Sequence, residues 1–144
     1  MAYCVLLRHA RSTANTAGVL AGWSDGVHLD DAGREQAAEV ADRLAHLPLV
    51  RVVSSPLPRC LETVGPLADQ LGLEVERSED LGEARYGAWT GRPLKELAED
   101  PLWETVQRTP SRAVFPASDE HEHESLATMA QRAVAEVRRI DAEV

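Results

Sequence analysis

An apolar run opens the chain and stops at two basic residues. Ala2 to Leu7 is almost entirely apolar, and Arg8 and His9 follow it directly. A continuous apolar run of this length is typical of a strand that is covered on both faces of a parallel sheet. We therefore expect a buried strand over 2–7 that ends by presenting an arginine and a histidine side by side.

Two segments in the first half of the chain have the apolar spacing of amphipathic helices. Asp30 can cap a helix that runs to about His46, with its apolar residues on one face. A second helix is expected over Pro56–Leu71, with a kink at Pro66, and Gly72 suits its end. Both segments predict helices that pack one face against a sheet.

The last helix is expected over Ser125–Ala142. An apolar stripe runs along it, while Arg132, Arg138 and Arg139 are expected to face solvent. The stripe consists of Leu126, Met129, Ala130, Ala133, Val134, Val137 and Ile140.

Short strands are expected at Val50–Ser54 and Leu73–Glu76, and shorter helical pieces near 94–98 and 102–107. The order strand–helix–strand–helix–strand predicts an α/β fold of three layers, with a mostly parallel sheet flanked by helices. The sequence has no internal repeat and no linker. We therefore expect residues 1–144 to form one domain.

This architecture directs three basic groups toward one crevice. Open α/β sheets bind ligands at the carboxyl ends of their strands. Arg8 and His9 follow the first expected strand, and Arg59 lies three residues past the turn that ends at Pro56. The three side chains are expected to converge on a site the size of one anion.

These residue types suit phosphoryl transfer. A neutral histidine nitrogen is a competent nucleophile, and arginines stabilise the charge on the phosphoryl oxygens under attack. The leaving oxygen still needs a proton from a positioned carboxylic acid. Glu83, within "DLGEARYGAWTG", is the candidate for that acid.

The overall charge limits the classes of partner. The net charge is −9, which argues against nucleic acid or an anionic membrane as the main partner. No apolar stretch approaches the roughly 20 residues of a membrane-spanning helix, and no basic segment followed by an apolar one opens the chain. We expect a cytoplasmic protein.

Four blocks of the sequence resemble a known family in order and spacing. They are "LLRHARSTAN", "GWSDGVHLDDAGREQA", "VVSSPLPRCLET" and "EARYGAWTGR". Together they resemble the histidine phosphatase superfamily, which is also called phosphoglycerate mutase-like. The resemblance covers the chain from Tyr3 to about Ile140.

The resemblance implies a role for each matching residue. His9 would attack in line and become phosphohistidine, and Glu83 would act first as an acid and then as a base. Nothing in this scheme requires a metal or another cofactor. The remaining positions fall into two groups: Arg8, Asn15 and Arg59 would hold the phosphoryl oxygens, and Ser12 and Trp23 would line the substrate pocket.

The sequence departs from the family pattern at three places. Ala10 stands where the family has glycine, and a block that is usually "FPGGES" is stretched to "FPASDEHEHES". The family also carries a second catalytic histidine in a strand after the last helix, which these 144 residues do not contain. We expect the sequence to be incomplete at its C-terminal end, or a second copy to pair with it as a homodimer, or the domain to be a degraded relative.

Several residues have two interpretations. His121 and His123 suggest a metal site or a substitute for the second histidine, but two histidines in an acidic loop are more often solvated. Tyr86 and Trp89 either border the substrate cleft or pack beneath it. The solvated interpretation is favoured for the histidines, and both interpretations stay open for the aromatic residues.

Three functions remain in contention. The leading hypothesis is a metal-independent phosphomonoesterase that acts on a small-molecule phosphomonoester through phosphohistidine. The second is a phosphoglycerate mutase, although the short stretch between Glu83 and Phe115 suits hydrolysis better than the long insertion of mutases. The third is a non-catalytic phosphate-binding or interaction domain, and the sequence does not name the substrate.

Overall fold

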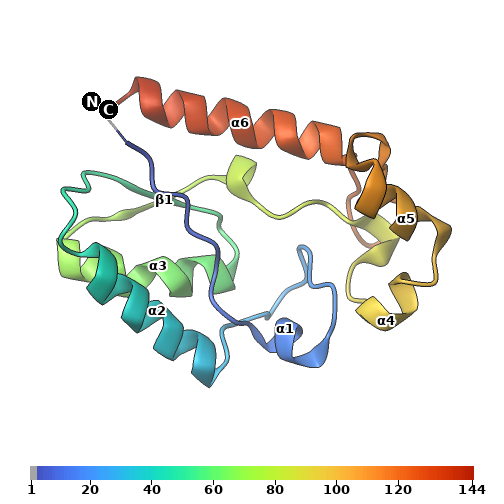
Figure 1. Cartoon of the computed structure of the whole chain (residues 1–144), viewed down its shortest axis with the longest axis horizontal. Helices are drawn as coiled ribbons and strands as arrows, with labels where there is room; N and C mark the ends of the chain where they lie inside the picture. The colour runs from blue at the N-terminus through green and yellow to red at the C-terminus, as the bar shows by residue number, and fades with distance from the viewer. Residues whose placement is uncertain (1–2) are drawn as a thin grey trace. The chain divides into compact units, whose positions relative to one another are not determined.

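The computed structural model describes residues 3–144, and its contacts divide the chain into two compact units (Figure 1). The units alternate along the sequence. Residues 5–16 and 26–82 form the first, called the strand unit here, and residues 3–4, 17–25 and 83–144 form the second, called the aromatic unit. The expectation of a single domain over 1–144 stays a prediction.

The strand unit has an α/β arrangement. Its elements are α1 (Thr13–Ala17, whose last residue belongs to the aromatic unit), α2 (Asp31–Leu44), β1 (Val52–Ser54), α3 (Pro58–Leu71), β2 (Val75–Arg77) and the 3₁₀ turn η1 (Glu79–Leu81). Strands β1 and β2 pair in parallel, with Val52 opposite Val75 and Ser54 opposite Arg77. Helix α3 contacts both strands, and α2 packs against α3. The predicted α/β class with a parallel sheet is confirmed.

Local hydrogen bonds explain where the two long helices of this unit begin and end. The Asp30 carboxylate accepts a hydrogen bond from the backbone N–H of Gly33 at 2.7 Å, which caps α2 as expected. Helix α3 begins at Pro58, two residues later than predicted, and continues through Pro66. Gly72 ends α3 in the left-handed conformation, with a φ of 66°, as the sequence predicted.

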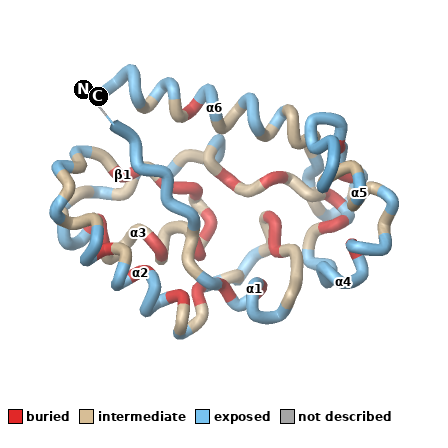
Figure 2. Tube along the Cα trace, in the orientation of Figure 1, coloured by how far each residue is buried: buried red, intermediate tan, exposed pale blue. Residues whose placement is uncertain are grey.

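Within residues 3–144, the predicted first strand is not formed. Ala2 lies outside the described residues, and residues 3–11 form no helix or strand. Leu6 is 79% exposed, and within residues 3–144 no backbone hydrogen bond joins segment 3–9 to another segment. The tube in Figure 2 is accordingly coloured as exposed over residues 3–8. An apolar run becomes a strand only where a neighbour pairs with its backbone groups, and composition alone does not supply that neighbour.

The aromatic unit packs its elements around large aromatic side chains. The elements are the 3₁₀ turn η2 (Gly87–Trp89), α4 (Leu94–Leu97), α5 (Pro101–Arg108), the 3₁₀ turn η3 (Pro110–Arg112) and α6 (Leu126–Ala142). Ala84, Trp89, Leu97 and Phe115 form the buried centre. The rings of Tyr86 and Phe115 meet edge to face with centroids 4.8 Å apart, a favourable geometry for aromatic pairs.

Helix α6 begins as predicted, and Leu126 and Met129 of its apolar stripe pack against the core of the unit, but the rest of its burial differs from the prediction. Ser125 caps it by accepting a hydrogen bond from the N–H of Thr128 at 3.0 Å. Val134, which belongs to the apolar stripe, is 48% exposed, whereas Glu136 is buried. The prediction that Arg132 faces solvent is wrong, because its guanidinium is turned inward to polar partners described below.

Within residues 3–144, every helix is too short or too polar to cross a membrane.

Candidate active site

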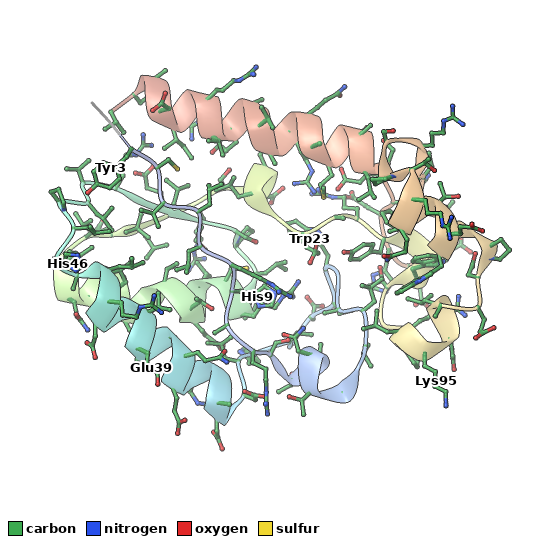
Figure 3. All side chains as sticks on the ribbon, in the orientation of Figure 1. Tyr3, His9, Trp23, Glu39, His46 and Lys95 are labelled. Carbon is green, nitrogen blue, oxygen red and sulfur yellow. The ribbon has the colours of Figure 1, made fainter. Side chains whose placement is uncertain are left out.

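His9, labelled in Figure 3, ends the N-terminal segment of the strand unit, and the next residue, Ala10, contacts its ring. Its Nδ1 atom lies 2.7 Å from the carbonyl oxygen of Ala10. Because a carbonyl oxygen can only accept, Nδ1 carries the hydrogen in this contact. In the neutral imidazole, the lone pair then lies on Nε2.

One hydrogen bond links this segment to α3, and a second, within α3, continues from there to the backbone of Arg59. The backbone N–H of Ala10 donates to Thr63 Oγ1 at 2.9 Å, and the Thr63 hydroxyl donates to the carbonyl of Arg59 at 2.6 Å. Arg59 is only 2% exposed, and Thr63 is buried with it. His9 and Arg59, which are 50 residues apart in the sequence, are thereby tied to one another through Ala10 and Thr63.

Ser12 and Asn15 form a local cap on α1. The Asn15 Oδ1 atom accepts hydrogen bonds from the Ser12 backbone N–H at 2.9 Å and from its hydroxyl at 3.0 Å. Ser12 is buried, while Asn15 is exposed. Since the amide oxygen is used in this turn, the group that Asn15 can offer to an anion is its NH2.

The loop after His9 is fastened to the start of α2. The Asp30 carboxylate accepts hydrogen bonds from the Thr16 hydroxyl at 2.6 Å and from Nε of Arg11 at 2.5 Å. These bonds, with that from the Gly33 N–H, lower the pKa of Asp30 from 3.8 to about 2. A Cβ on Gly33 would lie 1.9 Å from the carbonyl oxygen of Arg11, so the close approach of loop and helix requires glycine.

Glu83 belongs to the aromatic unit, where its carboxylate and its backbone are both held. Its Oε1 atom accepts hydrogen bonds from the Ala84 N–H at 2.8 Å and from the Tyr86 hydroxyl at 3.2 Å. Its carbonyl oxygen accepts from the indole N–H of Trp23 at 2.7 Å and from Nη2 of Arg132 at 2.9 Å. Trp23, labelled in Figure 3, thus contacts the residue expected to act as the acid.

Glu124 connects the Glu83 loop to α6. Its Oε1 accepts hydrogen bonds from the Arg85 N–H at 3.0 Å and Nη2 of Arg132 at 2.5 Å, and its Oε2 accepts from Nε of Arg132 at 3.1 Å. Burial of the carboxyl works to raise its pKa. Hydrogen bonds from Arg132 and Arg85 and the charges of both arginines outweigh burial, so the pKa of Glu124 lies below its ordinary value.

The structure gives Tyr86 and Trp89 different surroundings. Trp89 is buried in the core, and its indole N–H donates to Asp100 at 3.3 Å. Tyr86 packs its ring on Phe115 while its hydroxyl reaches the Glu83 carboxylate. Trp89 therefore packs in the core, whereas Tyr86 connects that core to the Glu83 carboxylate.

The histidines of the acidic loop do not form part of a metal cluster. Within residues 3–144, no group of three or more His, Cys, Asp or Glu side chains is arranged to hold a metal ion. His123 is exposed, and its Cβ lies where a side chain on Gly87 would have to fit.

The predicted site residues therefore divide between the units. Arg8, which is exposed, His9, Ser12, Asn15 and Arg59 belong to the strand unit, while Trp23 and Glu83 belong to the aromatic unit. The assignment of their roles stays a prediction. Sequence reasoning missed Arg132, although one signal was available: it follows Met129 by three residues, at the edge of the apolar stripe of α6.

An imidazole can act as a nucleophile, and a guanidinium can bind phosphoryl oxygens, so His9 and Arg59 on an α/β scaffold suit the handling of phosphoryl groups. Residues 4–144 match the model of the histidine phosphatase superfamily, branch 1. The chain belongs to this superfamily, as its motifs predicted.

Curated relatives with named activities include phosphatases and mutases. The glucosyl-3-phosphoglycerate phosphatase of Mycolicibacterium vanbaalenii is 38% identical over 87 residues, which cover 60% of this chain and 38% of the relative. The 2,3-bisphosphoglycerate-dependent phosphoglycerate mutase of Streptococcus gordonii is 35% identical over 104 residues, which cover 69% of this chain and 45% of the relative. The chain thus spans less than half the length of either protein.

Solved structures agree with the fold. A mycobacterial glucosyl-3-phosphoglycerate phosphatase superposes with a TM-score of 0.77 and 26% identity, over 94% of this chain and 61% of that one. The similarity places this chain among proteins with the histidine phosphatase fold.

Proposed function

We propose that the chain carries the site of a phosphomonoester hydrolase that acts through a phosphohistidine on His9. One observation carries this proposal: the Ala10 carbonyl fixes the hydrogen on Nδ1 of His9, while Ala10 and Thr63 tie the same segment to Arg59. The backbone beside His9 and the backbone of the buried Arg59 are then joined through one threonine hydroxyl. The substrate class is a small-molecule phosphomonoester.

In the first step, Nε2 of His9 attacks the phosphorus atom of the ester. A P–N bond forms as the bond to the leaving oxygen breaks, and the carboxylic acid of Glu83 donates its proton to that oxygen. The alcohol leaves, and the phosphoryl group stays on His9.

In the second step, water attacks the phosphohistidine. The Glu83 carboxylate takes a proton from the water as the new P–O bond forms and the P–N bond breaks. Inorganic phosphate leaves, and both His9 and Glu83 return to their starting states. Each step uses side chains of the protein alone.

The remaining predicted residues bind rather than react. Arg8 and Arg59 hold the phosphoryl oxygens and stabilise the charge that develops on them. Asn15 adds a hydrogen bond from its NH2 group, since its oxygen is engaged by Ser12. Trp23 contributes to the pocket from beside Glu83, and Ser12 acts there through Asn15.

A phosphoglycerate mutase is the second candidate, and the match to the Streptococcus gordonii mutase favours it. A mutase must protect its phosphohistidine from water and return the group to a second hydroxyl. Only 31 residues separate Glu83 from Phe115, which leaves little chain to cover the intermediate. Hydrolysis is therefore the function we propose first.

The test uses the 144-residue chain and its His9→Ala variant. We expect hydrolysis of simple phosphomonoesters by the parent chain, an acid-labile phosphate on it after incubation with a labelled ester, and neither in the variant. Phosphatase activity that persists in His9→Ala would overturn the mechanism. Interconversion of 2- and 3-phosphoglycerate without release of phosphate would favour the mutase instead.

A further inference from the structure

The carbonyl oxygen of Glu83 accepts hydrogen bonds from two residues of the aromatic unit that lie far apart in the sequence. Trp23 donates to it at 2.7 Å from the segment 17–25, and Arg132 donates at 2.9 Å from α6. A carbonyl oxygen has two lone pairs, so these two donors use its full capacity. Few loop residues are fixed at the backbone in this way, because loops are ordinarily the more mobile parts of a fold.

Arg132 is itself fixed before it reaches Glu83. Two of its nitrogens bind the two carboxylate oxygens of Glu124, and the Arg132 and Glu124 side chains are 13% and 8% exposed. The planar fork of a guanidinium allows this paired contact and a third hydrogen bond at the same time, which an ammonium group cannot reproduce.

Glu124 also binds the backbone of the same loop at Arg85, two residues after Glu83. Its carboxylate accepts from the Arg85 N–H, and its backbone N–H donates to the Arg85 carbonyl, both at 3.0 Å. The Arg85 guanidinium lies 4.6 Å from the ring centroid of Trp23, within the range of a cation–π contact. The loop is therefore held at residues 83 and 85 by the same buried ion pair.

We propose that Arg132, paired with Glu124, is a positioning residue that sets the orientation of the Glu83 carboxyl for proton transfer. This inference rests on the proposed function, in which Glu83 is the acid. A buried ion pair is by itself weak support for stability, since apolar replacements of such pairs are often as stable. Its hydrogen bond to the backbone of the proton donor gives this pair a use that apolar residues could not supply.

The proposal predicts that variants of Arg132 lose kcat/KM to an extent that depends on the leaving group of the ester. An alkyl phosphate needs a proton on its leaving oxygen, whereas p-nitrophenolate leaves readily without one. A displaced Glu83 should therefore impair hydrolysis of the alkyl ester selectively. A purely structural defect would reduce the active fraction and lower kcat/KM for both esters by the same factor.

The test compares kcat/KM for an alkyl phosphate and for p-nitrophenyl phosphate in two variants. Arg132→Lys keeps the charge but loses the fork. The double variant Arg132→Met with Glu124→Gln leaves no unpaired buried charge, and the amide oxygen of the new glutamine can still accept from the Arg85 N–H. Arg138→Met, an exposed position on the same helix, is the matched control. Thermal unfolding of each variant reports whether it folds.

We expect kcat/KM for the alkyl ester to fall about 10- to 100-fold in both variants, with little change for p-nitrophenyl phosphate and no change for either ester in Arg138→Met. Equal losses for both esters, or no loss for either, would overturn the positioning role. The variant Glu83→Gln distinguishes a failure of the positioning role of Arg132 from a failure of the proposed function. If it loses activity selectively on the alkyl ester while the Arg132 variants do not, only the positioning role fails; if Glu83→Gln retains full activity, the proposed function fails.

Discussion

The backbone N–H of Ala10 donates to Thr63 Oγ1, and the same hydroxyl donates to the carbonyl of Arg59. One threonine therefore joins the segment that carries His9 to the first turns of α3. Because this hydroxyl accepts one bond and donates another, an apolar side chain of the same shape would lose both bonds.

Thr63→Val tests this connection. The change keeps the shape of the side chain but leaves the half-buried Ala10 N–H without its acceptor, so we expect a loss of about 1 to 3 kcal/mol in the free energy of unfolding. We also expect kcat/KM to fall about tenfold, because the His9 segment loses its tie to Arg59. Urea unfolding and steady-state kinetics measure the two effects. Thr63→Ser retains the hydroxyl and should keep most of the stability and most of kcat/KM. Equal losses in Thr63→Ser and Thr63→Val would contradict the role of the hydrogen bond.

Arg59→Met tests anion binding without requiring turnover. Inorganic phosphate that binds only the folded chain raises its stability, by about 2.7 kcal/mol when its concentration is 100 times the Kd. We expect phosphate to raise the Tm of the parent chain and not that of Arg59→Met, since the methionine fills the volume without a charge. Sodium chloride at matched ionic strength is the control for general salt effects. An undiminished response in Arg59→Met would show that this guanidinium does not bind the anion.

Gly87→Ala should destabilise the aromatic unit severely. Gly87 has a φ of 55°, and a Cβ there would lie 1.9 Å from the carbonyl oxygen of Pro116. We expect a loss of about 3 kcal/mol or more, from the strained backbone together with the clash. Gly91, with a φ of 78° and no atom closer than 3.9 Å to its added Cβ, is the matched control. Gly91→Ala should cost only about 1 to 2 kcal/mol in urea unfolding, and similar losses at both positions would contradict the close approach.

Asp30→Asn tests the acid sensitivity of the α2 cap. Hydrogen bonds from Thr16, Arg11 and Gly33 lower the pKa of Asp30 to about 2 from 3.8. A depressed pKa contributes stability above the unfolded value, and that stability disappears as the pH falls through the folded value. We expect the parent chain to have the higher Tm at about pH 5, and the difference from Asp30→Asn to vanish as the pH approaches about 2. A difference that stays constant over this range would show that the charge of Asp30 contributes nothing.

The longer helices could be predicted closely because their signals are local, whereas the short α1 was not expected. Asp30, Gly72 and Ser125 cap or end helices through hydrogen bonds to residues within a few positions, so the sequence around each is sufficient. The two described strands were also expected, with shifts of one to two residues at their ends. Strand 2–7 could not be judged in this way, because pairing depends on a partner elsewhere in the fold.

The candidate site was predictable in its residue types but not in its supporting contacts. Four motif blocks indicated the superfamily and named His9, Arg59 and Glu83. No pattern indicated that the carbonyl of Ala10 holds the His9 ring, or that Arg132 binds the carbonyl of Glu83. Backbone carbonyls carry no side-chain identity, so a sequence cannot show which of them a given donor will find.

The sequence by itself determined the superfamily and the longer helical segments, and it named the candidate site residues, since these depend on residue type and near-neighbour spacing. The tertiary structure decided that segment 3–9 stays unpaired within the described chain, that α6 turns Arg132 inward, and that a buried ion pair holds the Glu83 loop. The position of Arg132 depends on a hydrogen bond to Glu83, which is 49 residues away in the sequence, and a strand over 3–9 would likewise need a distant partner. Such bonds are satisfied only when the chain folds, because a buried polar group must then find whichever partner lies within reach.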